Sequence, residues 1–200
     1  MKIGILGGTF NPIHNGHLLI AQNALDQFDL DKIWFMPAAI PPHKQEANIL
    51  DARHRMQMIL RAIDGNSSFE LNPRELFKGG ISYTYQTLEE LKNECPENEY
   101  YFIIGADSLM KFHTWKYPEL ILKYAEVLVA VRDHVAGEQM KETMVKITSE
   151  FGGHIQQIYT PEFNVSSQEI RNRVNMRHSI RYLLPDAVCQ YILDENLYKG

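Results

Sequence analysis

The chain has 200 residues, of which 44% are hydrophobic and 22% are charged, and its formal net charge is −5. This length and composition fit one globular domain with a full hydrophobic core. The negative charge excludes a global positive field, so neither nucleic acid nor an anionic membrane is an expected partner, and local cations and backbone amides would have to attract any phosphate ligand.

The cysteine content and the N-terminal segment predict a protein of a reducing compartment. Cys95 and Cys189 are too few for a disulfide scaffold and lack the spacing of a metal site. The first strand-like run starts at the N-terminus without the long apolar stretch of a signal peptide, and no window reaches the roughly 18 apolar residues of a membrane helix. We expect a cytoplasmic protein that does not span a membrane.

Short apolar runs alternate with longer amphipathic segments along the whole chain. The apolar runs predict strands at Ile3–Leu6, Ile33–Met36, Tyr100–Ile104, Glu126–Val131 and, more weakly, Ile155–Tyr159. The amphipathic patterns predict helices over about 16–28, 51–63, 83–93, 115–123, 139–151 and 186–193. In the second of these helices, the pattern places Met56, Ile59, Leu60 and Ile63 on one face.

The alternation of strands and helices predicts the fold class. It indicates right-handed βαβ crossovers and therefore an α/β fold, a Rossmann-like, open, mostly parallel sheet with helices on both faces, in a single domain over residues 1–200. Ligands of such sheets bind beyond the carboxyl ends of the strands, near the point where the strand order reverses. The loops after Leu6, Met36, Ile104 and Val131 are therefore the expected places for a site.

The loop after the first strand has the strongest functional signal. It reads Gly7-Gly8-Thr9-Phe10-Asn11-Pro12-Ile13-His14-Asn15-Gly16-His17. Its glycines let backbone amides approach a ligand, and a helix starting near Gly16 adds the positive end of its dipole, which suits phosphate. His14 and His17 could donate hydrogen bonds to a phosphoryl group during displacement. The alternative is that one histidine caps the helix and the other packs on its first turn.

A second segment near the other end of the chain has a related character. It reads Asn164-Val165-Ser166-Ser167-Gln168-Glu169-Ile170-Arg171. Ser166 or Ser167 can cap the helix that follows, whose amides would face an anion, and Arg171 can bind phosphate oxygens with its planar fork. Taken alone, the segment is more typical of an ordinary capped helix with exposed arginines at 171 and 173.

Together the two segments resemble the motifs of the HxGH nucleotidyltransferase superfamily, and more closely those of the bacterial nicotinate-nucleotide adenylyltransferases. The first motif usually reads GGTFDPIHxGH, and this chain has Asn11 in place of the Asp. The second resembles ISSTxIR, with Gln168 in place of the Thr, so a hydroxyl contact at that position is not expected. Because the motifs lie near opposite ends, the resemblance covers essentially the whole chain.

The resemblance implies an enzyme that transfers AMP from ATP to nicotinate mononucleotide, giving nicotinate adenine dinucleotide and pyrophosphate in NAD biosynthesis. The implied catalytic residues are His14, His17 and Arg171. The implied ATP-binding residues are Gly7, Gly8, Thr9, Phe10, Gly16, Gly105, Asp107, Ser166 and Ser167. Mg²⁺ is expected to enter bound to ATP, because the sequence shows no carboxylate cage for a metal. The sequence leaves a homo-oligomer open.

The implied acceptor site lies between the two motifs, at Lys44, Thr84, Trp115 and Arg132. The simpler alternatives are an exposed loop lysine at 44 and a core tryptophan at 115, and Asp107 could merely cap a helix. The PPHK, SYT, GxD and tryptophan segments resemble nicotinate-nucleotide adenylyltransferases more than pantetheine-phosphate adenylyltransferases. A sibling enzyme that uses phosphopantetheine or CTP, and a non-catalytic nucleotide-binding module, remain as alternatives.

Overall fold

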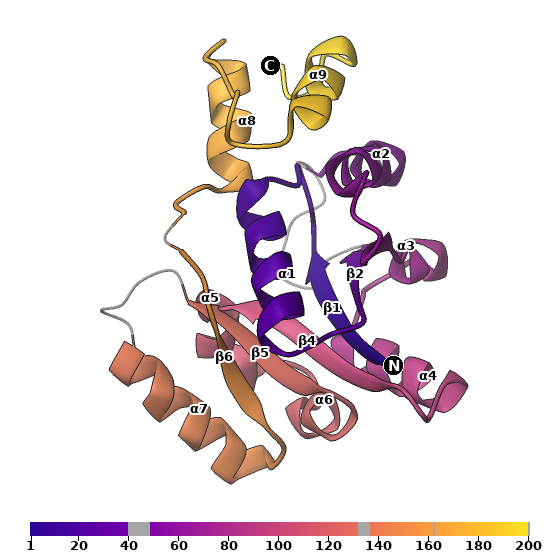
Figure 1. Cartoon of the computed structure of the whole chain (residues 1–200), viewed down its shortest axis with the longest axis vertical. Coiled ribbons are helices and arrows are strands. Elements are labelled where there is room, and N and C mark those ends of the chain that lie inside the picture. The colour runs from indigo at the N-terminus through magenta and orange to yellow at the C-terminus, as the bar shows by residue number, and fades with distance from the viewer. Residues whose placement is uncertain (40–48, 132–136, 162, 200) are drawn as a thin grey trace.

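The computed structural model describes residues 1–39, 49–131, 137–161 and 163–199, and Figure 1 shows an open sheet with helices on both faces. The strands are β1 (Lys2–Gly8), β2 (Lys32–Pro37), β3 (Phe69–Leu71), β4 (Glu99–Gly105), β5 (Glu126–Val131) and β6 (Ile155–Tyr159). Their order is β3-β2-β1-β4-β5-β6, and every neighbouring pair is parallel. The predicted fold class is therefore confirmed, and the strand order reverses between β1 and β4.

Most helices of the described residues connect these strands, and the last two follow β6. In chain order the helices are α1 (Asn15–Gln27), α2 (Ala52–Ile63), α3 (Arg74–Lys78), α4 (Thr84–Glu94), α5 (Ala106–Met110), α6 (Pro118–Tyr124), α7 (Gly137–Phe151), α8 (Ser167–Asn175) and α9 (Asp186–Asp194), with a 3₁₀ turn, η2, at Phe112–Thr114. None of these helices is long and apolar enough to cross a membrane.

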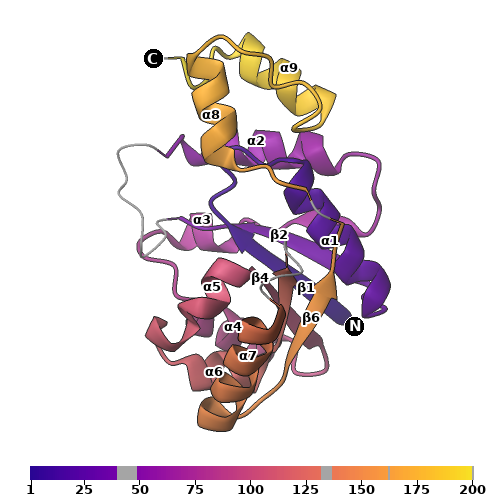
Figure 2. The same ribbon diagram turned by 90° about the vertical axis from the view of Figure 1, so that its left-hand side faces the viewer.

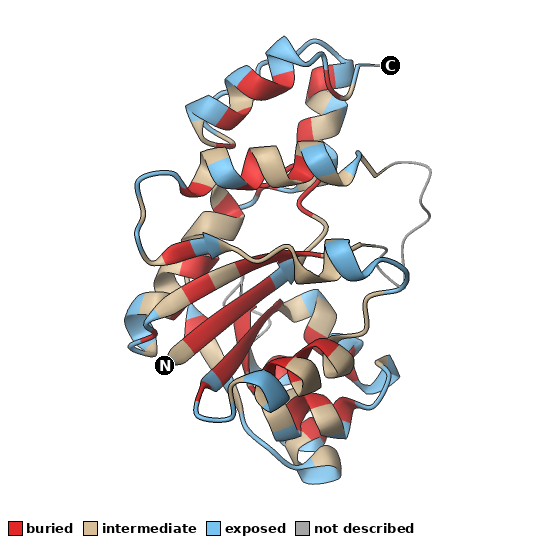
Figure 3. Cartoon of the chain, turned by 90° about the vertical axis from the view of Figure 1, so that its right-hand side faces the viewer, coloured by how far each residue is buried: buried red, intermediate tan, exposed pale blue. Residues whose placement is uncertain are grey.

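Two hydrophobic cores lie on the two faces of the sheet, because successive strand residues point in opposite directions. Leu6 of β1 belongs to the core that packs against α1, α2, α8 and α9. Ile3 and Ile5 belong to the core that packs against α4, α5, α6 and α7. Figure 3 shows the buried strands between these layers. Coverage on both faces explains why β4 and β5 read as continuous apolar runs.

The C-terminal helices extend the molecule beyond the sheet. Figures 1 and 2 show α8 and α9 at the end of the molecule toward which β1 runs, with α2 between them and the sheet. Ile170 of α8 and Val188 of α9 are fully buried in the first core. The last part of the chain is thereby fixed beside the loop that follows β1.

Two local predictions were wrong. In α2, Leu60 is 45% exposed, whereas Arg55 is 2% exposed, so the buried face is rotated from the predicted one. The helix expected from Trp115 begins only at Pro118, because Tyr117 takes a left-handed conformation with φ 52° and proline is preorganised for the first helical position. The short elements β3, α3 and α5 were not predicted.

Candidate active site

A cavity of about 690 Å³ lies at the carboxyl ends of β1 and β4, where the strand order reverses. Its wall combines the loop after β1 with the start of α5 and with the 82–84 and 114–116 segments. Of the residues singled out from the sequence, those that line it are Gly7, Gly8, Thr9, His17, Thr84, Gly105, Asp107 and Trp115. The predicted location of the site, beyond the strand ends, therefore agrees with the cavity.

His17 and His14 form a stacked pair at the start of α1. Their ring centroids are 3.7 Å apart, and the backbone N–H of His14 donates to Nδ1 of His17 at 3.2 Å. Since Nδ1 accepts this bond, a neutral His17 ring carries its proton on Nε2. His17 lines the cavity. His14, at the N-cap position of α1, is 2% exposed and is not among the residues that line the cavity.

Gly16 and Phe10 shape the loop that presents His17. A Cβ at Gly16 would lie 3.1 Å from both Nδ1 of His14 and Cγ1 of Val165, so a side chain there would push the two motifs apart. Phe10 is buried with φ 48°, and its ring packs edge-on against His17 at 5.1 Å between centroids. A left-handed conformation at a bulky residue is costly, and such positions concentrate at functional loops.

The second motif is bonded directly to the first. Oγ of Ser167 donates to the carbonyl of Pro12 at 2.8 Å, and Nη1 of Arg171 donates to the carbonyl of Asn11 at 2.8 Å. Ser166 caps α8 by accepting from the backbone N–H of Glu169. The two segments, which are more than 140 residues apart, therefore meet as expected. Neither Arg171 nor the two serines is among the described residues that line the cavity.

Asn11 connects this contact to a group of residues that the sequence reasoning missed. Its Oδ1 accepts from the hydroxyl of Tyr198 at 2.9 Å and from the backbone N–H of Leu50 at 3.3 Å. Burial raises the pKa of Tyr198 far above its ordinary value, despite the opposing effect of Arg171 and Arg55, so the phenol stays a neutral donor. The amide of Asn11 thus holds the C-terminus against the loop.

Arg55 is the second missed residue. Its Nη1 donates to the carbonyls of Thr9 and Ala38, at 3.0 and 2.8 Å, and its Nε donates to the carbonyl of Leu50 at 3.1 Å. Burial lowers its pKa, opposed by Asp51 and Tyr198. The signal in the sequence was a charged side chain at a position of α2 that faces the core. A buried arginine is rarely without a structural or functional partner.

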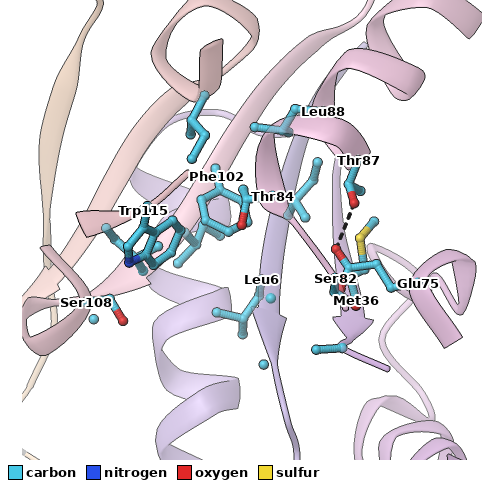
Figure 4. A pocket seen from close by; sticks show the side chains of 18 of the residues that line it. Leu6, Met36, Glu75, Ser82, Thr84, Thr87, Leu88, Phe102, Ser108 and Trp115 are labelled. Atoms are coloured by element: carbon cyan, nitrogen blue, oxygen red, sulfur yellow. Dashed lines mark hydrogen bonds between the residues drawn. The ribbon is translucent and has the colours of Figure 1, made fainter. Parts of the chain in front are cut away.

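The opposite wall of the cavity combines aromatic and hydroxyl side chains (Figure 4). The half-buried ring of Trp115 packs edge-on against Phe102, with 6.1 Å between centroids. Oγ1 of Thr87 donates to the carboxyl of Glu75 at 2.9 Å, and burial raises the pKa of Glu75. Lys44 and Arg132 lie outside the described residues, and no group of three or more potential metal ligands occurs within the described ranges.

Comparison with known proteins decides the family. Residues 5–173 match the model of the cytidylyltransferase-like family. A protein of Lachnoclostridium phytofermentans is 39% identical over 98% of both chains, and one of Geobacter sp. (strain M21) is 41% identical over 99% of this chain and 98% of its own. Both are named "Probable nicotinate-nucleotide adenylyltransferase". The chain belongs to the nicotinate-nucleotide adenylyltransferase family.

The fold of this family member is also found in solved structures. The Plasmodium falciparum nicotinic acid mononucleotide adenylyltransferase complexed with NaAD superposes with a TM-score of 0.81 over 98% of this chain and 97% of that one. The identity is 22%, which shows the fold alone. The family predicted from the two motifs is confirmed, whereas the roles assigned to individual residues of this nicotinate-nucleotide adenylyltransferase stay predictions.

Proposed function

We propose that the chain transfers the adenylyl group of ATP to the phosphate of nicotinate mononucleotide and releases pyrophosphate. The observation that carries this proposal is the lining of one cavity, which unites the Gly7–Thr9 segment and His17 with Thr84 and Trp115. The first group suits a polyphosphate, and the second suits a flat ring with a polar substituent. The relatives named above support the assignment over the full length of the chain.

The reaction needs no protein nucleophile. An oxygen of the acceptor phosphate, already anionic, attacks the α-phosphorus of ATP in line with the bond to the bridging oxygen of the β-phosphate. That bond breaks, its electron pair goes to pyrophosphate, and a new phosphorus–oxygen bond joins the two nucleotides. Catalysis then consists of alignment of the two substrates and stabilisation of the charge that develops on the transferred group.

The loop after β1 supplies the donors for this stabilisation. His17 would donate from Nε2 to an oxygen of the α-phosphate, with the tautomer fixed by the bond from the backbone of His14 to Nδ1. The ring of His14 would support that of His17 by stacking. Arg171 would bind the triphosphate and hold α8 on the loop through the carbonyl of Asn11.

The remaining roles follow from the family resemblance and, for the described residues, from their position. Gly105, at the end of β4, and Asp107, in the first turn of α5, would hold the nucleoside of ATP. Ser166 and Ser167 at the start of α8 would face its phosphates. Thr84 and Trp115 would bind the acceptor ring, with Lys44 and Arg132 on the acceptor phosphate. ATP would enter as its Mg²⁺ complex.

The proposal is tested by mixing the purified protein with Mg²⁺ and a panel of substrates and measuring pyrophosphate. ATP with nicotinate mononucleotide should give pyrophosphate and one equivalent of the dinucleotide. Preferred turnover of phosphopantetheine, or of CTP in place of ATP, would assign a sibling activity. Binding of ATP without pyrophosphate release from any acceptor would indicate a nucleotide-binding module instead.

A further inference from the structure

A lysine stands at the rim of the cavity, on the wall that we assign to the acceptor. Lys116 follows Trp115 directly, and it is the one lysine or arginine among the described residues that line the cavity. Its side chain is exposed, and Tyr83 and Thr84 line the same wall. The charge of Lys116 therefore lies close to the residues that would bind the acceptor ring.

Aromatic rings fix the position of this ammonium group. Nζ of Lys116 lies 4.5 Å from the ring centroid of Tyr83, 5.7 Å from that of Tyr117 and 6.0 Å from that of Tyr85. Within the described part of the chain, no carboxylate lies within 4.0 Å of it. Cation–π contacts orient an ammonium without neutralising its charge. Lys116 is thus held in place and still able to pair with an anion.

The surroundings favour an anion over a neutral group at this wall. Thr84 begins α4, whose first turn contains no acidic residue, so the positive end of its dipole is not offset there. The two acidic residues of the described wall are Glu75, which accepts from Thr87, and Asp107, which lies in α5 beyond the end of β4. Neither lies in the loop between η2 and α6, which contains Lys116.

We propose that Lys116 selects the acceptor by charge, pairing with the ring carboxylate of nicotinate mononucleotide and so disfavouring the nicotinamide nucleotide. This inference rests on the proposed function. The carboxylate and the carboxamide have nearly the same size and shape, so apolar packing discriminates weakly between them. A lysine offers only donors, so it pairs with both oxygens of a carboxylate but gains nothing from the amide NH₂.

The test compares kcat/KM for the two nucleotides in the wild type, Lys116→Gln, Lys116→Arg and the control Lys111→Gln. Lys111 is also exposed and lies in the same stretch of chain, but it does not line the cavity, so its variant removes the same net charge elsewhere. If nicotinamide mononucleotide turns over too slowly, its inhibition constant replaces kcat/KM.

We expect Lys116→Gln to lower the preference for the acid nucleotide about threefold to fivefold, mainly through KM, which is the upper range for one charge pair at an exposed site. Lys116→Arg should keep most of the preference, and Lys111→Gln should keep all of it. The preference of the wild type should also fall as ionic strength rises, because the pair is exposed to screening.

Equal losses for both nucleotides, or an unchanged ratio in Lys116→Gln, would overturn the assignment of Lys116 and leave the proposed function intact. A wild type that releases no pyrophosphate with either nucleotide would overturn the proposed function, and the assignment of Lys116 with it. A loss of preference in Lys111→Gln as large as that in Lys116→Gln would assign the effect to overall charge, which also contradicts the proposal.

Discussion

Replacement of Arg55 by methionine tests how the loop after β1 is held. Methionine fills nearly the same volume but offers no donor, so the carbonyls of Thr9, Ala38 and Leu50 lose the bonds that the guanidinium gives them. A buried carbonyl left without a donor costs roughly 1 kcal/mol or more. Relief from burying the charge, whose cost is visible in the lowered pKa of Arg55, offsets part of this. We expect a net loss of about 2–4 kcal/mol in the free energy of unfolding.

Urea unfolding of Arg55→Met beside Arg53→Met measures this loss with a matched control. Arg53 lies on the exposed face of the same helix, so its replacement removes the same charge and should change stability by less than about 0.5 kcal/mol. Below the transition, Arg55→Met should also raise KM for ATP, because Thr9 lines the cavity. A stability within about 1 kcal/mol of wild type would refute the reasoning, and unchanged ATP kinetics would refute the coupling to the site.

Three further predictions concern the cavity itself. His17→Ala should lower kcat by about 10²-fold with little change in unfolding free energy, and normal turnover would remove its catalytic role. Trp115→Ala should raise KM for the acceptor more than KM for ATP, and equal increases would remove the stacking role. Burial raises the pKa of Glu75 above its ordinary 4.5, so near this pH the folded chain retains a proton that the unfolded chain releases. The free energy of unfolding should therefore fall as pH rises from about 4.5 to the folded pKa. Glu75→Gln should abolish that decline. If the curves of unfolding free energy against pH were parallel for the wild type and Glu75→Gln, the prediction would be wrong.

The sheet could be predicted from the sequence because its strands are buried on both faces. Short continuous apolar runs such as Tyr100–Ile104 and Glu126–Val131 are typical of strands covered on both faces, and most of the helices between strands are long enough to show a period. The elements that were missed, α3 and α5, have five residues each, which is less than two turns and too short for a periodic pattern. The start of α6 was misplaced because Tyr117, not a glycine, takes the left-handed conformation.

The candidate site was predicted in its position, but its internal contacts were not. The strand-end rule and the two motifs point to the loop after β1 and to α8. No spacing in the sequence indicates that Ser167 bonds to Pro12, or that Tyr198 bonds to Asn11, because such contacts depend on how α8 and α9 pack beyond the sheet. The face of α2 was misjudged because its prediction counted apolar residues alone, whereas the structure buries Arg55, which donates to three backbone carbonyls.

Under the proposed function, two buried or partly buried guanidiniums would help a chain with a net charge of −5 to bind a polyanion. Arg55 and Arg171 both donate to backbone carbonyls of the first motif, at Thr9 and Asn11. Within the described ranges, no carboxylate lies within 4.0 Å of either, so neither guanidinium forms an ion pair, although Asp51 lies near enough to Arg55 to raise its pKa. The amide of Asn11 preserves this imbalance, since it accepts from Tyr198 without adding the negative charge of an aspartate. Partial burial makes these charges act more strongly on a nearby phosphate than exposed charges would. Under the proposed function, these two positive charges beside the loop would supply the attraction for phosphate that the overall composition does not.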